Sequence, residues 1–274
     1  MSLEQTIADL VAASNNLTGT INTKMNEIDQ KVDQATESVP GVMRDKARQI
    51  FYVDGVDGDN GNSGTSISPL KDWEGVKDRL IPQFETVVRF RGGQTHIISG
   101  AGPNYSGFVD VSSWGYETLG VPTLKMAYDD VRDGKRDGAF LKLSNAVARL
   151  TQVRLESQYE GSETLHEAAA FFGRYPGNST VILDACQVSL KNVPLSHQYP
   201  GYATTDFTLR NTSITKETGS DALGVMVANT SGGGEYATTR LDILNVSFTG
   251  TDLEEQFRAK VDYSNILSNL DLGA

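Results

Sequence analysis

STVILDACQVSLKN, residues 179–192, carries the pattern that decides the fold. Its apolar residues alternate imperfectly with polar ones, with Val181, Leu183 and Val188 among the apolar positions. Such alternation predicts a strand with one buried face. Similar short stretches, separated by Gly, Asn, Asp and Ser, recur along the chain without a long helical period between them. The candidate strands are 86–90, 95–99, 108–114, 123–128, 139–144, 148–157, 179–192, 206–215, 224–231, 240–250 and 260–269.

Five of these stretches share a loose repeat in which an amide precedes an apolar or Thr position. The aligned pairs are Gln152–Val153, Gln187–Val188, Asn211–Thr212, Asn245–Val246 and Asn265–Ile266, at steps of 35, 24, 34 and 20 residues. Repeats of this size are typical of solenoids, in which each unit buries its apolar face on the next. The expected fold is therefore a parallel β-helix with loops of variable length. A β-sandwich is the alternative, since it also uses many short strands.

Composition excludes several functions. The chain has 274 residues and a formal net charge of -11, which argues against nucleic-acid partners and against adsorption to anionic membranes. Its one cysteine, Cys186, rules out an intrachain disulfide and is expected to be a buried small residue. No apolar run approaches the roughly 18 residues of a membrane span, so no membrane insertion is expected.

The N-terminal segment has an apolar seam at heptad spacing, with one doubled step of four that makes a stutter. A seam this narrow predicts a self-associating coiled coil, and Ile and Val at both kinds of seam position favour three strands. The alternative is a helix that folds back on its own domain. Pro40 and Gly41 are expected to end or kink the helix. The residues predicted to form the trimer contact are Leu3, Ile7, Leu10, Leu17, Ile21, Met25, Ile28 and Val32.

A junction follows, in which a short strand around Ile50 and Tyr52 leads into a loop rich in Asp, Asn and Gly. Ser68 and Pro69 are expected to begin a helix over residues 69–80, with Pro82 closing it. The loop offers oxygen ligands that suit calcium, but no register fits an EF-hand, and Asx turns explain the same residues. The oxygen-bearing residues are Asp54, Asp57, Asp59, Asn60 and Asn62.

No catalytic constellation stands out. His96, His166 and His197 lack metal-ligand spacing, and the many carboxylates cannot be paired from sequence. No catalytic residue, cofactor or metal ligand is therefore assigned. Aromatic residues in loop contexts could stack on sugars, and the candidates for a glycan contact are Trp114, Tyr116 and Tyr105.

Two stretches resemble a known group of proteins. MSLEQTIADLVAASNNLTGTINTKMNEIDQKVD, at the start, resembles the N-terminal segment of tail fibre proteins from tailed bacteriophages. YVDGVDGDNGNSGTSISPLKDWEGVKDRLIPQFETVVRF resembles the beginning of right-handed parallel β-helices in phage tailspikes. The resemblance covers residues 1–92, and it departs at Asp72, Glu74 and Gly75, where small and Ile-rich positions are usual.

The resemblance implies three domains: a coiled coil for trimerisation and virion attachment over 1–45, a junction with capping helix over 46–85, and a β-helix body over 86–274. It implies a homotrimeric virion component that binds other phage tail proteins through its N-terminus and recognises host surface polysaccharide. The alternative is a depolymerase, hydrolase or lyase, acting on capsule or lipopolysaccharide. A monomeric secreted lyase is a third hypothesis, which the seam disfavours.

Overall fold

The computed structural model describes residues 2–166, 168–174, 177–198, 204–220, 224–229, 238–257 and 266–269, without the side chains of 38–47, 174, 198 and 229. The chain divides into two units, Met1–Ala47 and Arg48–Ala274. The first is a single helix, α1 (Leu3–Ala47). Among the described residues, no helix combines the length and apolar content needed to cross a membrane.

Helix α1 passes through Pro40 and Gly41 and ends at Ala47, so the predicted end of the helix at these residues is wrong, whereas the alternative of a kink there stays a prediction. A proline removes one hydrogen bond from the helical ladder, but the bonds on either side of that gap can still form.

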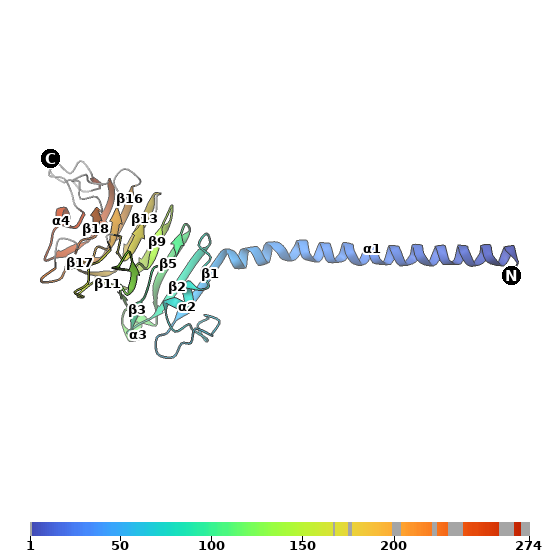
Figure 1. Cartoon of the computed structure of the whole chain (residues 1–274), viewed down its shortest axis with the longest axis horizontal. Helices are drawn as coiled ribbons and strands as arrows, with labels where there is room; N and C mark the ends of the chain where they lie inside the picture. The colour runs from blue at the N-terminus through green and yellow to red at the C-terminus, as the bar shows by residue number, and fades with distance from the viewer. Residues whose placement is uncertain are drawn as a thin grey trace. The chain divides into compact units, whose positions relative to one another are not determined.

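The second unit is mainly β, and its strands form three parallel sheets (Figure 1). The eight-stranded sheet contains β1 (Arg48–Val53), β2 (Glu85–Arg91), β5 (Phe108–Trp114), β10 (Val147–Thr151), β13 (Ser179–Asp184), β16 (Thr205–Arg210), β19 (Thr239–Leu244) and β21 (Ile266–Ser268). The six-stranded sheet contains β3 (Thr95–Ile98), β6 (Thr123–Met126), β11 (Arg154–Gln158), β14 (Gln187–Lys191), β17 (Ser213–Lys216) and β20 (Ser247–Thr249). The five-stranded sheet contains β4 (Asn104–Tyr105), β9 (Leu141–Leu143), β12 (Phe172–Arg174), β15 (Ser196–Gln198) and β18 (Val227–Asn229).

From β10 to β18 the chain visits the three sheets in strict rotation: eight-stranded, six-stranded, five-stranded, then back. Each strand pairs in parallel with the strand of the same sheet one circuit later. A sandwich of antiparallel sheets, the alternative from sequence, is therefore excluded. Within the described residues, β7 (Asp130–Arg132) and β8 (Lys135–Asp137) form an antiparallel hairpin. The short helices are α2 (Trp73–Lys77), α3 (Tyr116–Leu119) and α4 (Leu253–Phe257).

The core consists of inward side chains stacked in register. Val111, Leu150, Leu183 and Leu209 follow one another along the eight-stranded sheet, and each is completely buried. Burying one such side chain stabilises the fold by about 1.5–3 kcal/mol. A slip of one residue would turn this whole column outward, so the burial fixes the register.

Corners between the eight- and six-stranded sheets split four stretches that the sequence analysis treated as continuous strands. Each corner has one residue in the left-handed conformation, with φ near 50°: Gln152, Ala185, Asn211 and Asn245. The amide N–H groups of the first three each donate to a carbonyl one circuit on, at 2.9–3.0 Å. Asn245 Nδ2 also donates to Asn211 Oδ1 at 2.9 Å.

These corners correct the predicted repeat. The equivalent of Gln152, Asn211 and Asn245 is Ala185, not Gln187, so Cys186 rather than Val188 occupies the place of Val153. The pair at Asn265–Ile266 is not part of the series, because β21 belongs to the eight-stranded sheet. Cys186 is buried as predicted, its Sγ lies 3.3 Å from the Leu150 carbonyl oxygen, and burial raises its pKa to about 11.

The junction also differs from its prediction, since α2 spans only Trp73–Lys77 and not the expected residues 69–80. The capping residue of α2 is Asp72, whose side chain accepts from the Gly75 amide, and not Ser68. Leu70 forms a parallel bridge with Val53 and exchanges backbone hydrogen bonds with Tyr52 and Asp54 at 2.8 Å. Because the backbone at Leu70 is extended, the helix cannot begin at Pro69 and begins at Trp73 instead.

Ala185→Asn should stabilise the protein by about 0.5–1 kcal/mol, because Asn tolerates the left-handed conformation and its amide can extend the Asn211–Asn245 stack. Ala185→Val is the matched control and should destabilise, since a β-branched side chain is strained at positive φ. Thermal unfolding of both variants measures the difference. Equal melting temperatures for the two variants would contradict this role for the corner.

Candidate functional site

The outward face of the six-stranded sheet is the candidate site. Because side chains alternate along a strand, every second residue points out, and the parallel register aligns these residues in columns about 4.8 Å apart. One column runs Lys125, Glu156, Ser189, Thr215, Thr249. A second runs Thr123, Arg154, Gln187, Ser213, Ser247. Gln158 and Lys191 begin a third.

These columns enclose a hollow of about 440 Å³ over β11, β14 and β17. The hollow exists because Ser189, Ser213 and Thr215 are short, while the flanking side chains are long. All but one of its lining residues are polar; the lining comprises Arg154, Glu156, Gln158, Glu160, Gln187, Val188, Ser189, Lys191, Ser213, Thr215, Glu217 and Thr218.

A hydrogen-bond network holds the long side chains. Gln158 Nε2 donates to Ser189 Oγ at 2.6 Å, and Ser189 Oγ donates to Glu217 Oε1 at 2.5 Å. Arg154 Nε donates to Gln187 Oε1 at 3.0 Å. A groove rigidified in this way offers hydroxyl, amide and carboxylate groups in fixed positions, which suits a ligand rich in hydroxyl groups.

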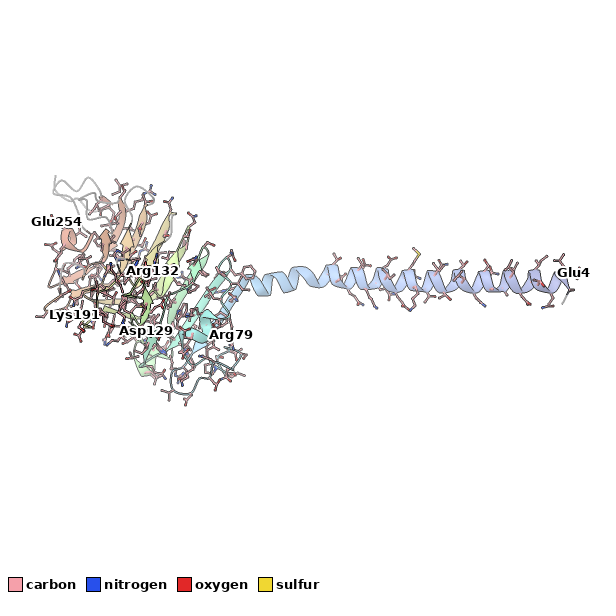
Figure 2. All side chains as sticks on the ribbon, viewed as in Figure 1. Glu4, Arg79, Asp129, Arg132, Lys191 and Glu254 are labelled. Atoms are coloured by element: carbon pink, nitrogen blue, oxygen red, sulfur yellow. The ribbon has the colours of Figure 1, made fainter. Side chains whose placement is uncertain are left out.

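Three carboxylates lie in the hollow, from Glu156, Glu160 and Glu217. Glu160 is paired with Lys191, which is labelled in Figure 2, and the hydrogen bond from this lysine lowers the pKa of Glu160. Glu156 lies 3.9 Å from the Lys125 ammonium group. A general acid needs a raised pKa, so Glu160 does not suit that role.

The three aromatic candidates do not gather at one site. Tyr105 is 1% exposed, and its hydroxyl group donates to the carbonyl oxygens of Phe84 and Phe108, so its ring is part of the core. Tyr116 begins α3 and is half-buried. Three other tyrosines of the chain, Tyr175, Tyr199 and Tyr202, lie outside the described residues.

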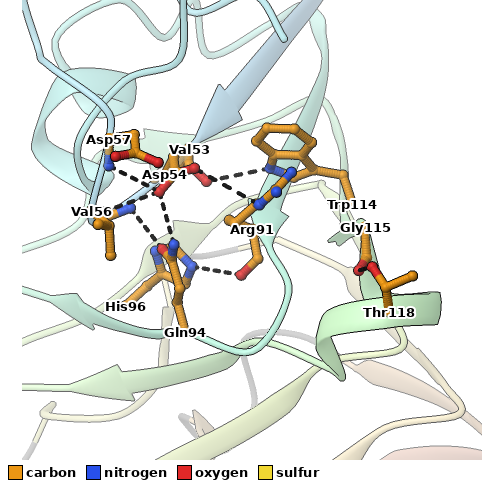
Figure 3. Close-up of polar contacts among 11 residues, drawn as sticks. Val53, Asp54, Val56, Asp57, Arg91, Gln94, His96, Trp114, Gly115 and Thr118 are labelled. Carbon is orange, nitrogen blue, oxygen red and sulfur yellow. Dashed lines mark hydrogen bonds and ion pairs between the residues drawn. The ribbon is translucent and has the colours of Figure 1, made fainter. Parts of the chain in front are cut away.

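Trp114 is half-buried at the end of β5 (Figure 3). The Arg91 guanidinium lies 4.3 Å from its ring centre, and Tyr52 meets it edge-on at 5.4 Å. Trp114 Nε1 donates to the Val53 carbonyl at 3.4 Å. Because Arg91 covers one face of the ring, at most the other face remains for a ligand.

The Asp-rich loop is held by its own side chains. Asp54 Oδ1 accepts hydrogen bonds from the amides of Val56 and Asp57 and from Gln94 Nε2, at 2.8–3.2 Å (Figure 3). These bonds confirm the Asx-turn interpretation, and they contribute to a lowered pKa of Asp54 against the opposing effect of its burial. Within the described part of the chain, no group of three or more His, Cys, Asp or Glu side chains could hold a metal ion.

The sequence analysis considered His197 only as a possible metal ligand and did not predict that its pKa is shifted. It is 5% exposed on β15, and among the described residues its Nδ1 has no hydrogen-bond partner. Burial lowers its pKa to about 4, and the nearby His166 adds to this effect. His166 Nε2 itself lies 3.6 Å from Asp133 Oδ2. Sequence spacing gave no sign that these two histidines influence one another.

No family model matches the chain, and no curated protein matches it. Among solved structures, a rhamnogalacturonan lyase is similar, with a TM-score of 0.39 and 10% sequence identity. The match covers 74% of this chain and 59% of the lyase, so the chain spans under two thirds of that protein.

The fold should lose stability on acidification through His197. The unfolded chain takes up this proton below a pKa of about 6.5, whereas the folded chain does so only near 4. Stability therefore falls as the pH drops through that window, by at most about 3 kcal/mol.

His197→Gln cannot titrate, so its melting temperature should fall less than that of the wild type between pH 7 and pH 4.5. Contributions from all other groups cancel in the comparison. Parallel melting curves for the two proteins would refute the assignment.

Proposed function

We propose that the protein is a homotrimeric tail fibre or tailspike component of a tailed bacteriophage, located on the virion. In this proposal α1 forms a three-stranded coiled coil and binds other tail proteins, and the body is a right-handed parallel β-helix that recognises host surface polysaccharide. The resemblance of residues 1–92 to phage proteins supplies the class of protein. The rotation of the chain through three parallel sheets supports the β-helix.

The observation that carries the proposal is the exposed seam of α1. Its eight predicted contact residues, Leu3, Ile7, Leu10, Leu17, Ile21, Met25, Ile28 and Val32, are 49–76% exposed. A long helix with an open apolar stripe gains most of its stability from a partner. Further copies of the same helix supply that partner with matching periodicity.

The hollow of the six-stranded sheet supports the polysaccharide part of the proposal. Its polar lining matches the many hydroxyl groups of a glycan, and the long open face allows several sugar units to lie across neighbouring strands. Three copies would present three such sites to a repetitive polymer, so a weak single site would suffice.

A polysaccharide-cleaving enzyme is the second candidate. The observation that favours it is the presence of Glu156, Glu160 and Glu217 in one hollow, since glycosidases use two carboxylates. Because the pKa of Glu160 is lowered, a hydrolase would need Glu156 or Glu217 as its acid. New reducing ends would indicate cleavage by either route, and unsaturated products would identify the reaction as elimination and not hydrolysis.

The full-length protein should have the native mass of three chains by light scattering. Ile21→Asp should shift it to single chains at low concentration, because the trimer would bury three unpaired carboxylates. Thr23→Asp, on the opposite side of α1, should leave the mass unchanged. A single-chain mass for the wild type would contradict the proposal and favour a monomeric enzyme.

Ser189→Trp should abolish binding to bacterial capsule and lipopolysaccharide preparations, because the indole fills the hollow. Thr249→Trp lies in the same column outside the hollow, so it should bind as the wild type does. Binding can be measured by surface plasmon resonance on immobilised polysaccharides. Equal loss in both variants, or no loss in Ser189→Trp, would place the contact elsewhere.

A further inference from the structure

A second hollow, of about 320 Å³, lies over three stacked corners between the eight- and six-stranded sheets. The corners are residues 185–187, 211–213 and 245–247, and we call this hollow the corner hollow. At each corner the left-handed residue and the outward residue two positions later flank an inward residue, such as buried Cys186 or Thr212. Columns of stacked side chains therefore form two walls and a floor.

The first wall is the column of left-handed residues. Asn245 Nδ2 donates to Asn211 Oδ1 at 2.9 Å, so these two amides hold one another in place. Ala185 is level with Asn211 one circuit earlier and has no amide, so the wall recedes at that level. Among the described residues, Asn245 Oδ1 has no hydrogen-bond partner, and it can accept a hydrogen bond from a ligand.

The second wall belongs to the outward column of the six-stranded sheet that contains Gln187, Ser213 and Ser247 at successive levels. Arg154 Nε donates to Gln187 Oε1 at 3.0 Å, which fixes the glutamine and leaves its Nε2 group as a donor. Gln187 and Ser213 also line the hollow of the six-stranded sheet. Because the Ser213 side chain is short, the two hollows meet over it.

The two hollows differ in charge. The hollow of the six-stranded sheet is lined by charged side chains of both signs, whereas none of the described residues that line the corner hollow is charged. Its amide and hydroxyl groups can donate hydrogen bonds to sugar hydroxyls and accept them. A charged sugar would lose water there without gaining an opposite charge. The corner hollow therefore suits an uncharged sugar unit.

We propose that the corner hollow is a second subsite for the polysaccharide and takes an uncharged sugar unit of the same chain. The inference rests on the proposed function and adds to it a site and the class of sugar that this site accepts. A polysaccharide bound in the hollow of the six-stranded sheet continues over Ser213 into the corner hollow. Two further hydrogen bonds of ordinary strength raise the affinity about tenfold.

Fragments of bacterial capsule and lipopolysaccharide, sorted by length, test the subsite on the full-length protein by surface plasmon resonance. Wild-type affinity should rise about tenfold once a fragment is long enough to occupy both hollows. Ser247→Trp places an indole in the corner hollow, so it should remove this gain while short fragments bind as they do to the wild type. Thr249→Trp, on the same strand and outside both hollows, is the matched control and should keep the gain.

Asn245→Gly tests the wall separately and covers the case of a misfolded Ser247→Trp. Glycine keeps the left-handed corner and removes one amide, so the gain with length should shrink. Because the corner hollow carries no charge, the gain should be the same at low and high salt. A gain that high salt abolishes would overturn the assignment of an uncharged sugar.

Two results would overturn the second subsite and leave the proposed function standing. One is wild-type affinity that does not depend on fragment length. The other is a gain with length that Ser247→Trp and Asn245→Gly both keep, or that Thr249→Trp loses equally. A wild type that binds no fragment of any length would overturn the polysaccharide part of the proposed function together with the subsite.

Discussion

Parallel pairing in strict register is the constraint on which the rest of this structure depends. Among the described residues, each strand of the three parallel sheets pairs with strands one circuit before or after it, so no such strand can shift without moving the columns of Leu and Val beneath it. The left-handed residue at each corner is what permits this. It turns the chain sharply enough that the next strand begins two residues later, level with its predecessors.

The register that aligns the core side chains also determines which side chains lie next to one another on the outward faces of the six- and eight-stranded sheets. Short hydroxyl-bearing residues at neighbouring levels of the six-stranded sheet leave a hollow that no single strand encodes. On the eight-stranded sheet, the register sets charges of opposite sign at the two ends of β2 and β16. The chemistry of each outward face therefore depends on residues that neighbouring strands align in columns. The contribution of any one side chain depends on the residues next to it in its column.

This explains what the sequence predicted and what it could not. Alternating residues and the amides at Gln152, Asn211 and Asn245 were enough to predict strands and a repeating body, because those signals lie within one stretch of chain. Ala185 carries no such signal, so the repeat was aligned two residues late at that corner. The start of α2 was misplaced because the Leu70–Val53 bridge forms between distant segments. The hollow could not be predicted either, because it forms between residues of separate strands. Trp114 and Tyr105 were predicted as glycan contacts from their loop context alone.

The connections between strands differ widely in length. The segment from β11 to β12 spans residues 159–171, whereas the corresponding segment from β14 to β15 spans only 192–195. Both join the same two sheets, so the stacked strands tolerate insertions there without a change in register. Selection could therefore lengthen, shorten or exchange these segments while the scaffold stays intact. A lineage built on this architecture would be able to change its surface faster than it changes its fold.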